Sequence, residues 1–151
     1  MGERQQFQIW TDGACRGNPG PGGWGYISRS ASGDESSQYD AEQQTTNNRM
    51  ELMAVIEALR SLPGSSQVQL FSDSQYVIKG MKEWIVGWQR RGWRKSDGKP
   101  VVNDDLWKRL IEIAALHEIQ WEWVRGHSGH EENERCDGLA NRAIDEASWA
   151  P

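Results

Sequence analysis

Four acidic residues, spread over the whole chain, stand where each side chain can point into one shared pocket. They are Asp12, Glu51, Asp73 and Asp137. Carboxylates that lie close together repel one another, so a cluster is costly unless a cation neutralises it. Oxygen ligands of this hard type select Mg²⁺ or Mn²⁺ rather than zinc. The residue types therefore indicate a site for divalent cations.

A second chemical signal is the basic, tryptophan-rich segment at residues 79–99. It holds seven Lys and Arg residues and two acidic residues, a local charge of +5 in a chain whose net charge is −5. Trp84, Trp88 and Trp93 stand between these charges. A charge run is often only a solvated helix face, but interleaved basic and aromatic side chains also bind nucleic-acid strands. Together with the carboxylates, the segment predicts a metal-dependent phosphodiesterase that acts on nucleic acid.

Length and composition favour one soluble domain. The 151 residues fit a single domain over residues 1–151. No apolar run approaches the ~18 residues of a membrane span, and the polar N-terminus does not resemble a signal peptide. Two cysteines are too few for a disulfide framework. We therefore expect a cytoplasmic protein without a membrane partner. We also expect a monomer, because no predicted element carries a surplus apolar face.

Hydrophobic periodicity predicts an α/β fold. The predicted strands cover residues 7–12, 24–28, 37–43, 68–72 and 119–124. The predicted helices run from Thr45 or Thr46 to about residue 61, over 74–81 and 82–90, from Asn103 or Asp104 to about 115, and over 131–147. The glycine- and proline-rich run at 17–23 is predicted to be a turn. A strand, a helix and a strand in succession favour a parallel pair with a right-handed crossover.

These elements position the acidic residues. Asp73 ends the fourth strand, and ligand sites in parallel sheets lie beyond the carboxyl ends of the strands. Glu51 lies on the side of its helix that carries Ala54, Val55 and Ala58, so we expect it to point towards the core. Two interpretations of Glu51 remain open, a metal ligand or a complement to the helix dipole.

The strings around these residues, taken together, resemble ribonuclease H of the bacterial type I group from residue 7 to about 147. The shared strings are Thr11-Asp12-Gly13, Gly17-Asn18-Pro19-Gly20, Thr46-Asn47-Asn48-Arg49-Met50-Glu51, Asp73-Ser74-Gln75-Tyr76-Val77, Gly126-His127 and Asn133-Glu134-Arg135-Cys136-Asp137. The resemblance implies a five-stranded mixed sheet flanked by helices, in which strands 1–3 are antiparallel and strands 1, 4 and 5 are parallel. It also implies an endonuclease that cuts the RNA strand of RNA–DNA hybrids, with little sequence preference, and leaves 5′-phosphate and 3′-hydroxyl ends.

The resemblance further implies that the carboxylates bind Mg²⁺, with Mn²⁺ as a substitute. Two ions are expected with substrate bound and at least one without. Asp12 would bridge both ions, Glu51 and Asp73 would complete one site, and Asp137 the other. His127 would act in proton transfer or product release, for which its ordinary pKa of about 6.5 is suited. Removal of primers in DNA replication and clearing of R-loops are expectations for the family.

Substrate contacts are also implied by the resemblance. Asn18, Asn48 and Gln75 match positions in the minor groove, where the 2′-hydroxyl distinguishes RNA from DNA. Thr46 and Asn103 match a pocket for a phosphate of the DNA strand. Trp84 and Trp88 match the channel in which that strand lies, and Arg90, Arg91 and Arg94 back this channel. Three positions depart from the pattern of the family, and they are Gln44, Val102 and Glu131.

The remaining aromatic, cysteine and histidine residues are predicted to be structural. Five tryptophans are expected to be core or half-buried residues: Trp10, Trp24, Trp107, Trp121 and Trp123. Cys15 and Cys136 are expected to pack as small residues, and His117 and His130 to be ordinary histidines.

Three other functions remain as alternatives. One is a binding module for hybrids without catalytic activity, although all four carboxylates are present. Another is an integrase or transposase on the same fold, which would place its third acid differently. The third is a glycosidase that uses two acids, against which the basic segment argues.

Overall fold

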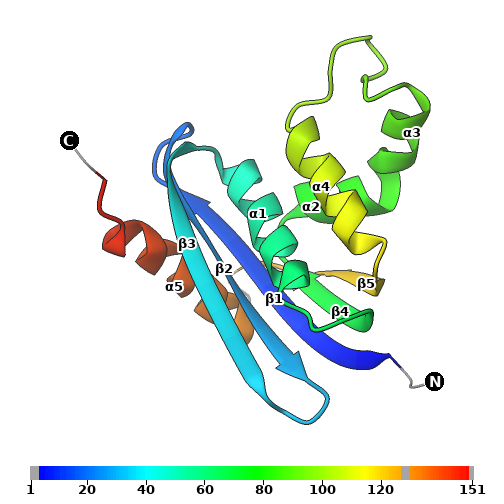
Figure 1. Ribbon diagram of the computed structural model, residues 1–151. Helices are drawn as coiled ribbons and strands as arrows, with labels where there is room; N and C mark the ends of the chain where they lie inside the picture. The colour runs from blue at the N-terminus through cyan, green and yellow to red at the C-terminus, as the bar shows by residue number, and fades with distance from the viewer. Residues whose placement is uncertain (1–3, 127–129, 150–151) are drawn as a thin grey trace.

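The computed structural model describes residues 4–126 and 130–149. Five strands form one sheet in the order β3-β2-β1-β4-β5 (Figure 1). The strands are β1 (Gln5–Cys15), β2 (Gly20–Ser30), β3 (Glu35–Thr45), β4 (Ser66–Ser72) and β5 (Glu118–Trp123). The first three strands pair antiparallel, and β1, β4 and β5 pair parallel. This topology confirms the predicted α/β fold with its mixed sheet.

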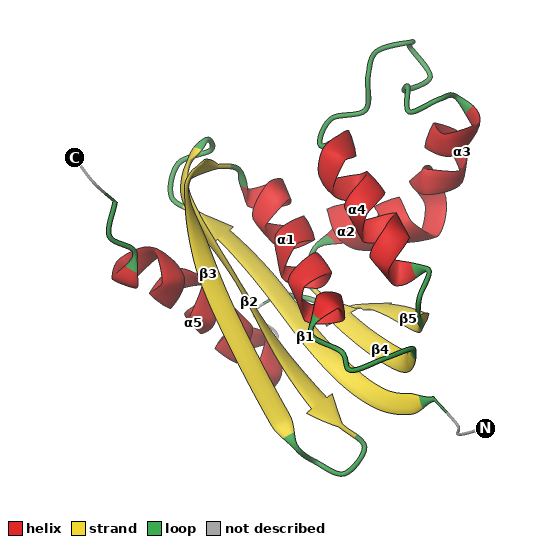
Figure 2. Cartoon of the chain, viewed as in Figure 1, coloured by secondary structure: helices red, strands yellow, loops and turns green. Residues whose placement is uncertain are grey.

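Helices cover both faces of the sheet (Figure 2). They are α1 (Asn47–Arg60), α2 (Gln75–Lys79), the π-helical turn η1 (Gly80–Trp84), α3 (Ile85–Arg90), α4 (Asp104–Ala114) and α5 (Glu131–Glu146). The helix α1 packs on β1 and β2 and on α4, whereas α5 packs on β1, β2 and β3 from the opposite face. Among the described residues, no helix has the length and apolar character that crossing a membrane requires.

The main core lies between the sheet and α1. Thr46 caps α1, because its hydroxyl accepts from the backbone N–H of Arg49 at 3.3 Å. The apolar face of this helix is buried and packs against Ile9 and Leu70 of the sheet; its residues are Leu52, Val55, Ile56 and Leu59. Each such side chain contributes about 1.5–3 kcal/mol when it leaves water. A smaller cluster of Trp10, Ile27 and Cys136 joins the sheet to α5.

Strand β2 begins earlier than predicted. It starts at Gly20, inside the run that the sequence predicts to be a turn, and Gly22 pairs with Cys15 of β1. Ladder hydrogen bonds use only backbone atoms, so the glycines do not prevent pairing. The turn is confined to residues 16–19, where Gly17 has φ +86°. The prediction of a turn over 17–23 is therefore wrong for its second half.

The two short helices predicted over 74–81 and 82–90 form one continuous helical stretch. A π-helical turn, η1, joins α2 to α3 in place of a break. Gly80 starts this turn directly against the ring of Trp107, which would collide with any Cβ at that position. Gly80 therefore marks close packing of η1 on α4, and not the end of a helix.

Most residues predicted to be structural are confirmed. Trp10, Trp24 and Trp107 are buried and Trp121 is half-buried. Trp123 is 43% exposed, which contradicts the expected packing, because it ends the edge strand β5. The Nδ1 atom of His117 accepts from the backbone N–H of Ser66 at 3.1 Å, an ordinary structural contact.

Candidate active site

Strands β1 and β4 bring two of the four acids together. Their parallel register pairs Thr11 with Ser72, so the next residues lie close together: Asp12, which is still within β1, and Asp73, which directly follows β4. Asp12 is buried, and its Oδ1 atom accepts from the backbone N–H of Gly13 at 2.9 Å. The position agrees with the expected site at the carboxyl ends of the parallel strands.

The third acid comes from α1, which crosses β1 at Gly13. A Cβ atom on Gly13 would lie 2.5 Å from the backbone nitrogen of Glu51, so only glycine permits this approach. Glu51 is buried, and α1 has no acidic residue in its first turn. The interpretation of Glu51 as a complement to the helix dipole is therefore wrong. Carboxylate oxygens of Asp12, Glu51 and Asp73 all lie within 4.8 Å of one another.

Asp137 lies at the edge of this cluster. It belongs to α5, which the thiol of Cys136 ties to β1 by donating to the carbonyl oxygen of Trp10 at 3.3 Å. The side-chain amide of Asn141 donates to Oδ1 of Asp137 at 3.4 Å. Asp137 is not one of the three acids within 4.8 Å, but it is close enough to Asp12 to raise the pKa of that carboxyl.

Burial and mutual repulsion make the cluster electrostatically costly. Burial, followed by repulsion from Asp73 and Asp137, raises the pKa of Asp12 to about 8. Burial, followed by repulsion from Asp12 and Asp73, raises the pKa of Glu51 well above its ordinary range. The Oε1 atom of Glu51 has no hydrogen-bond partner among the described residues. A buried oxygen without a partner, in an all-carboxylate set, fits a hard divalent cation.

The predicted phosphate pocket is assembled by a residue to which sequence reasoning gave no role. Arg49 donates its backbone N–H to the Thr46 hydroxyl at 3.3 Å. Its side chain donates to Oδ1 of Asn103 at 3.2 Å. Arg49 therefore joins Thr46 of α1 to Asn103 at the start of α4. The string around Glu51 contains Arg49, but a contact between α1 and α4 is not visible in the sequence.

The three predicted minor-groove residues are exposed. Asn18 and Asn48 lie near the start of α1, and Gln75 begins α2. Oδ1 of Asn18 accepts from the backbone N–H of Asn47 at 3.1 Å, which ties the turn before β2 to α1. This bond leaves the amide N–H groups of Asn18 to donate.

The predicted channel residues are partly structural. Trp84 and Trp88 are half-buried with their ring centroids 5.8 Å apart, and Trp88 also packs on the buried Trp107 at 5.3 Å. The three arginines are exposed. Arg91 donates to the carbonyl oxygen of Arg94 at 3.1 Å, and Arg94 donates to that of Gly98 at 2.9 Å. Two of the three arginines thus also shape the loop that carries them.

His127 lies outside the described residues. The chain that leads to it passes the carboxylates, because a Cβ atom on Gly126 would lie 3.0 Å from Oδ2 of Asp73. Gly126, the last described residue before His127, therefore lies beside Asp73.

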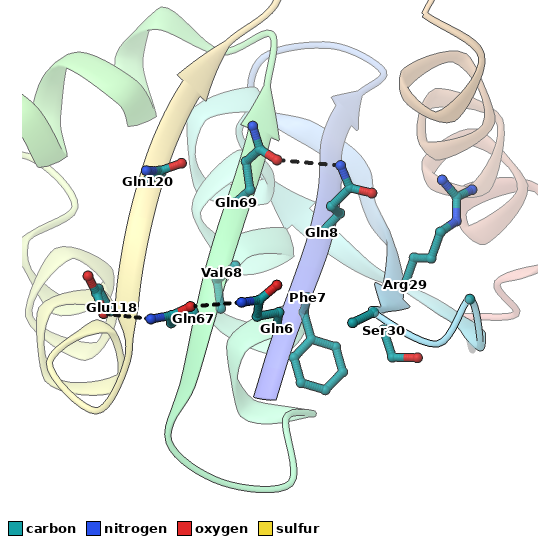
Figure 3. Close-up of a pocket in the computed structure, with 12 residues that line it drawn as sticks. Gln6, Phe7, Gln8, Arg29, Ser30, Gln67, Val68, Gln69, Glu118 and Gln120 are labelled. Atoms are coloured by element: carbon teal, nitrogen blue, oxygen red, sulfur yellow. Dashed lines mark hydrogen bonds between the residues drawn. The ribbon is translucent and has the colours of Figure 1, made fainter. Parts of the chain in front are cut away.

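A polar groove lies on the sheet, towards the opposite ends of β1, β4 and β5 (Figure 3). Its volume is about 660 Å³, and glutamine amides lie side by side across its floor. Gln8 donates to Gln69 at 3.4 Å, and Gln67 donates to Glu118 at 3.3 Å. These hydrogen bonds join lining side chains to one another across the floor of the groove.

Comparison with known proteins agrees with this geometry. The family model described as RNase H matches residues 4–145. The ribonuclease H of Bordetella bronchiseptica is 56% identical over 146 residues, which cover 97% of this chain and 94% of that protein. The solved LC9-RNase H1, a type 1 RNase H with the type 2 active-site motif, is 34% identical with a TM-score of 0.86, over 97% of this chain and 75% of that one. LC11-RNase H1, solved in complex with RNA/DNA hybrid, is 26% identical with a TM-score of 0.71, over 92% of this chain and 96% of that one. The chain belongs to the ribonuclease H family.

Proposed function

We propose that this protein is an endoribonuclease that hydrolyses the RNA strand of RNA–DNA hybrids. The products would carry 5′-phosphate and 3′-hydroxyl ends, and sequence preference would be slight, because the proposed contacts reach sugars and phosphates. The observation that carries the proposal is the convergence of Asp12, Glu51 and Asp73 within 4.8 Å in a chain of this family. A solved relative, LC11-RNase H1, binds RNA/DNA hybrid.

The proposed cofactor is Mg²⁺, with Mn²⁺ as a substitute. Asp12, Glu51, Asp73 and Asp137 would hold two ions when substrate is bound and at least one without it. Bound there, the ions would activate a water molecule and stabilise the departing 3′-oxygen. The four side chains present oxygen donors only and come from β1, α1, the end of β4 and α5.

Each acid has a task that follows from its place. Asp12 is the most central of the four acids, because both Asp73 and Asp137 repel its carboxylate. We assign Asp12 to both cation sites. Glu51 and Asp73 complete one site, and Asp137, at the edge of the cluster, serves the other. His127 follows Gly126 and is proposed to move a proton or to assist product release.

Recognition of the hybrid is assigned to two groups of residues beside the carboxylates, one for the sugars of the RNA strand and one for the DNA strand. Exposed amides of Asn18, Asn48 and Gln75 can donate to and accept from a 2′-hydroxyl. Thr46 and Asn103 would hold a phosphate of the DNA strand. The DNA strand would then follow a channel made by Trp84, Trp88, Arg90, Arg91 and Arg94.

One assay tests this function. The protein is incubated with labelled RNA–DNA hybrid, double-stranded RNA and double-stranded DNA, each with and without Mg²⁺. We expect cleavage of the RNA strand of the hybrid alone, and only with the cation. Asp12→Asn should bind the hybrid and cut it at a rate reduced by at least about 10³-fold, since one ligand of both cation sites is weakened. Cleavage without added cation, or by Asp12→Asn at the wild-type rate, would contradict the assignment.

A further inference from the structure

Asn141 lies inside α5, about one helical turn after Asp137. Asparagine is a poorer helix former than alanine or leucine, because its side chain competes for backbone hydrogen bonds. Helix formation therefore does not explain its presence. Its half-buried amide makes two bonds to Asp137, because Nδ2 donates to the backbone carbonyl oxygen at 3.0 Å and to Oδ1 of the carboxylate at 3.4 Å. The shorter bond anchors the amide, and the longer one holds the carboxylate.

The backbone around Asp137 is anchored on both sides. Before it, the thiol of Cys136 donates to a backbone carbonyl oxygen of β1 at 3.3 Å. After it, Arg16, which directly follows β1, donates to the backbone carbonyl oxygen of Asn141 at 3.3 Å and pairs with Asp145 at 2.7 Å. These contacts hold α5 against β1. The main freedom that remains at Asp137 is the rotation of its own side chain.

The electrostatics of the cluster act on that rotation. Asp137 and Asp12 repel one another, and Asp137 is only half-buried, so repulsion favours turning its carboxylate towards solvent. The N–H of Asn141 opposes this rotation, because a hydrogen bond to an ionised carboxylate is stronger than one between neutral groups. The amide thus keeps the carboxylate of Asp137 beside that of Asp12.

We propose that Asn141 is a positioning residue that presents the carboxylate of Asp137 to a divalent cation. This inference rests on the proposed function, because it assigns a supporting residue to the cation site of Asp137. Asn141 touches neither the cation nor the hybrid in this proposal. Once bound, the cation itself orients Asp137. Loss of the amide should therefore weaken cation binding and leave the maximal rate and the affinity for the hybrid unchanged.

The test is the substitution Asn141→Leu, which removes the donor and keeps a side chain of similar shape. Half-maximal cleavage should need about 3- to 10-fold more Mg²⁺, the range expected for one lost hydrogen bond. At saturating Mg²⁺, kcat and the KM for the hybrid should equal the wild-type values. Asn141→Gln should restore most of the loss, because a glutamine amide can also bond an aspartate one helical turn away.

Gly138→Ala is the matched control. Like Asn141→Leu it raises the helix propensity of α5 without a change of charge, and its added Cβ would meet open space. Both variants should melt at or above the wild-type midpoint in EDTA. Only Asn141→Leu should raise the Mg²⁺ requirement. Its rise in melting midpoint on addition of Mg²⁺ should also be smaller than that of wild type, a readout of cation binding that does not depend on activity.

A double-mutant cycle with Asp137→Ala separates positioning from a general effect on α5. Such a cycle isolates the interaction between two side chains. Asn141→Leu should reduce the Mg²⁺-induced rise in melting midpoint when Asp137 is present. In the Asp137→Ala background it should cause no further reduction, because the carboxylate through which it acts is gone.

Two results would overturn the inference while the proposed function stands. The first is an Asn141→Leu enzyme with the wild-type Mg²⁺ requirement and the wild-type Mg²⁺-induced rise in melting midpoint. The second is a reduction of that rise that persists in the Asp137→Ala background, which would make Asn141 a structural residue of α5 only. A wild-type protein that does not cut the hybrid at any Mg²⁺ concentration would instead overturn the proposed function.

Discussion

Gly13 sets the separation of Asp12 and Glu51. A Cβ atom there would lie 2.5 Å from the backbone nitrogen of Glu51 and 2.6 Å from the carbonyl carbon of Met50. Gly13→Ala must therefore push α1 away from β1. We expect kcat on the hybrid to fall by about 100-fold, because a misplacement of ~1 Å in a catalytic group has that effect. Steady-state kinetics with Mg²⁺ in excess would measure it.

Gly138 provides the matched control for Gly13. It belongs to α5, next to Asp137, and an added Cβ would meet open space. Gly138→Ala should retain wild-type kcat. Equal activity of Gly13→Ala and Gly138→Ala would show that the close crossing of α1 and β1 does not control the cluster.

The raised pKa of Asp12 predicts a conflict between function and stability at one residue. Burial raises the pKa of this carboxyl to about 8, whereas an unfolded Asp titrates near ~3.9. The folded state then binds the proton more tightly than the unfolded chain. The contribution of Asp12 to stability therefore falls as pH rises from about 4 to about 8. Asp12→Asn does not titrate, so its advantage over wild type should grow across this window.

Thermal unfolding in EDTA at pH 5 and pH 8.5 would measure this advantage. At pH 8.5 we expect Asp12→Asn to melt roughly 3–6 °C above wild type, which corresponds to relief of about 1–2 kcal/mol in a chain of this size. Added Mg²⁺ should raise the wild-type midpoint more than that of the variant. Asp34→Asn, in the exposed β2–β3 hairpin, should follow wild type at both pH values. A wild-type protein that is the more stable at pH 8.5 in EDTA would refute this account.

At the scale of elements, four charged side chains hold α5 against the β2–β3 hairpin. Glu35 pairs with Arg135 of α5 at 2.6 Å and with Arg29 of β2 at 2.9 Å. Arg29 also pairs with Glu132 of α5 at 3.2 Å. This network fixes the first turns of the helix that carries Asp137. A network of several pairs stabilises more than one exposed pair does.

The network predicts a stability difference that depends on pH. Hydrogen bonds from Arg135 and Arg29 lower the pKa of Glu35 to about 2. The stabilisation by Glu35 is therefore complete above pH ~4.5 and is lost as pH falls towards 2. Glu35→Gln should lower the melting midpoint by roughly 2–4 °C at pH 7, since a partly exposed network contributes about 1 kcal/mol. The difference from wild type should shrink between pH 4.5 and pH 2.5.

Glu118→Gln is the control for Glu35→Gln. Glu118 forms a single, largely exposed pair with Arg4 at 3.7 Å. Its loss should change the midpoint by less than about 1 °C, because isolated surface pairs contribute little. A Glu35→Gln protein that matches Glu118→Gln at pH 7 would show that the network does not stabilise α5.

Element types could be predicted from the sequence, whereas several boundaries could not. The helix α1 and the strand β1 follow from side-chain pattern, and both are confirmed. The start of β2 at Gly20 depends on backbone pairing with β1 and β3, to which glycine contributes no side-chain signal. The π-helical turn at Gly80 depends on the ring of Trp107, which is distant in sequence. A boundary that is set by tertiary contacts therefore cannot be predicted from a local sequence pattern.

At the scale of the molecule, the site likewise contains features that the sequence predicts and features that only tertiary contacts determine. The carboxylates stand in recognisable strings, and the fold brings Asp12, Glu51 and Asp73 together as expected. The contact of Tyr76 with Asn103 joins α2 to the start of α4. Neither residue type nor spacing reveals that hydrogen bond, because it depends on how three helices pack. Residues that act directly are thus more visible in a sequence than residues that hold them.

The uneven distribution of charge leads to a prediction about salt. Residues 79–99 carry +5 within a chain of −5, so binding of the hybrid should depend on the local segment and weaken steeply as salt rises. Arg90 tests this best, because it is exposed and its loss leaves the hydrogen bonds from Arg91 and Arg94 to the loop in place. With Asp12→Asn as the background to prevent cleavage, Arg90→Gln should reduce the slope of log Kd against log salt by about 0.7–0.9, the release of counterions at one phosphate.

Arg60→Gln is the control for Arg90→Gln, because Arg60 lies at the far end of α1 and pairs with Glu57 at 2.8 Å. Both substitutions remove one positive charge, so an effect of net charge alone would change the two slopes equally. A contact between Arg90 and the DNA strand changes only the slope of Arg90→Gln. Equal slopes for the two variants would assign the salt dependence to the charge of the whole protein and would remove Arg90 from the proposed channel.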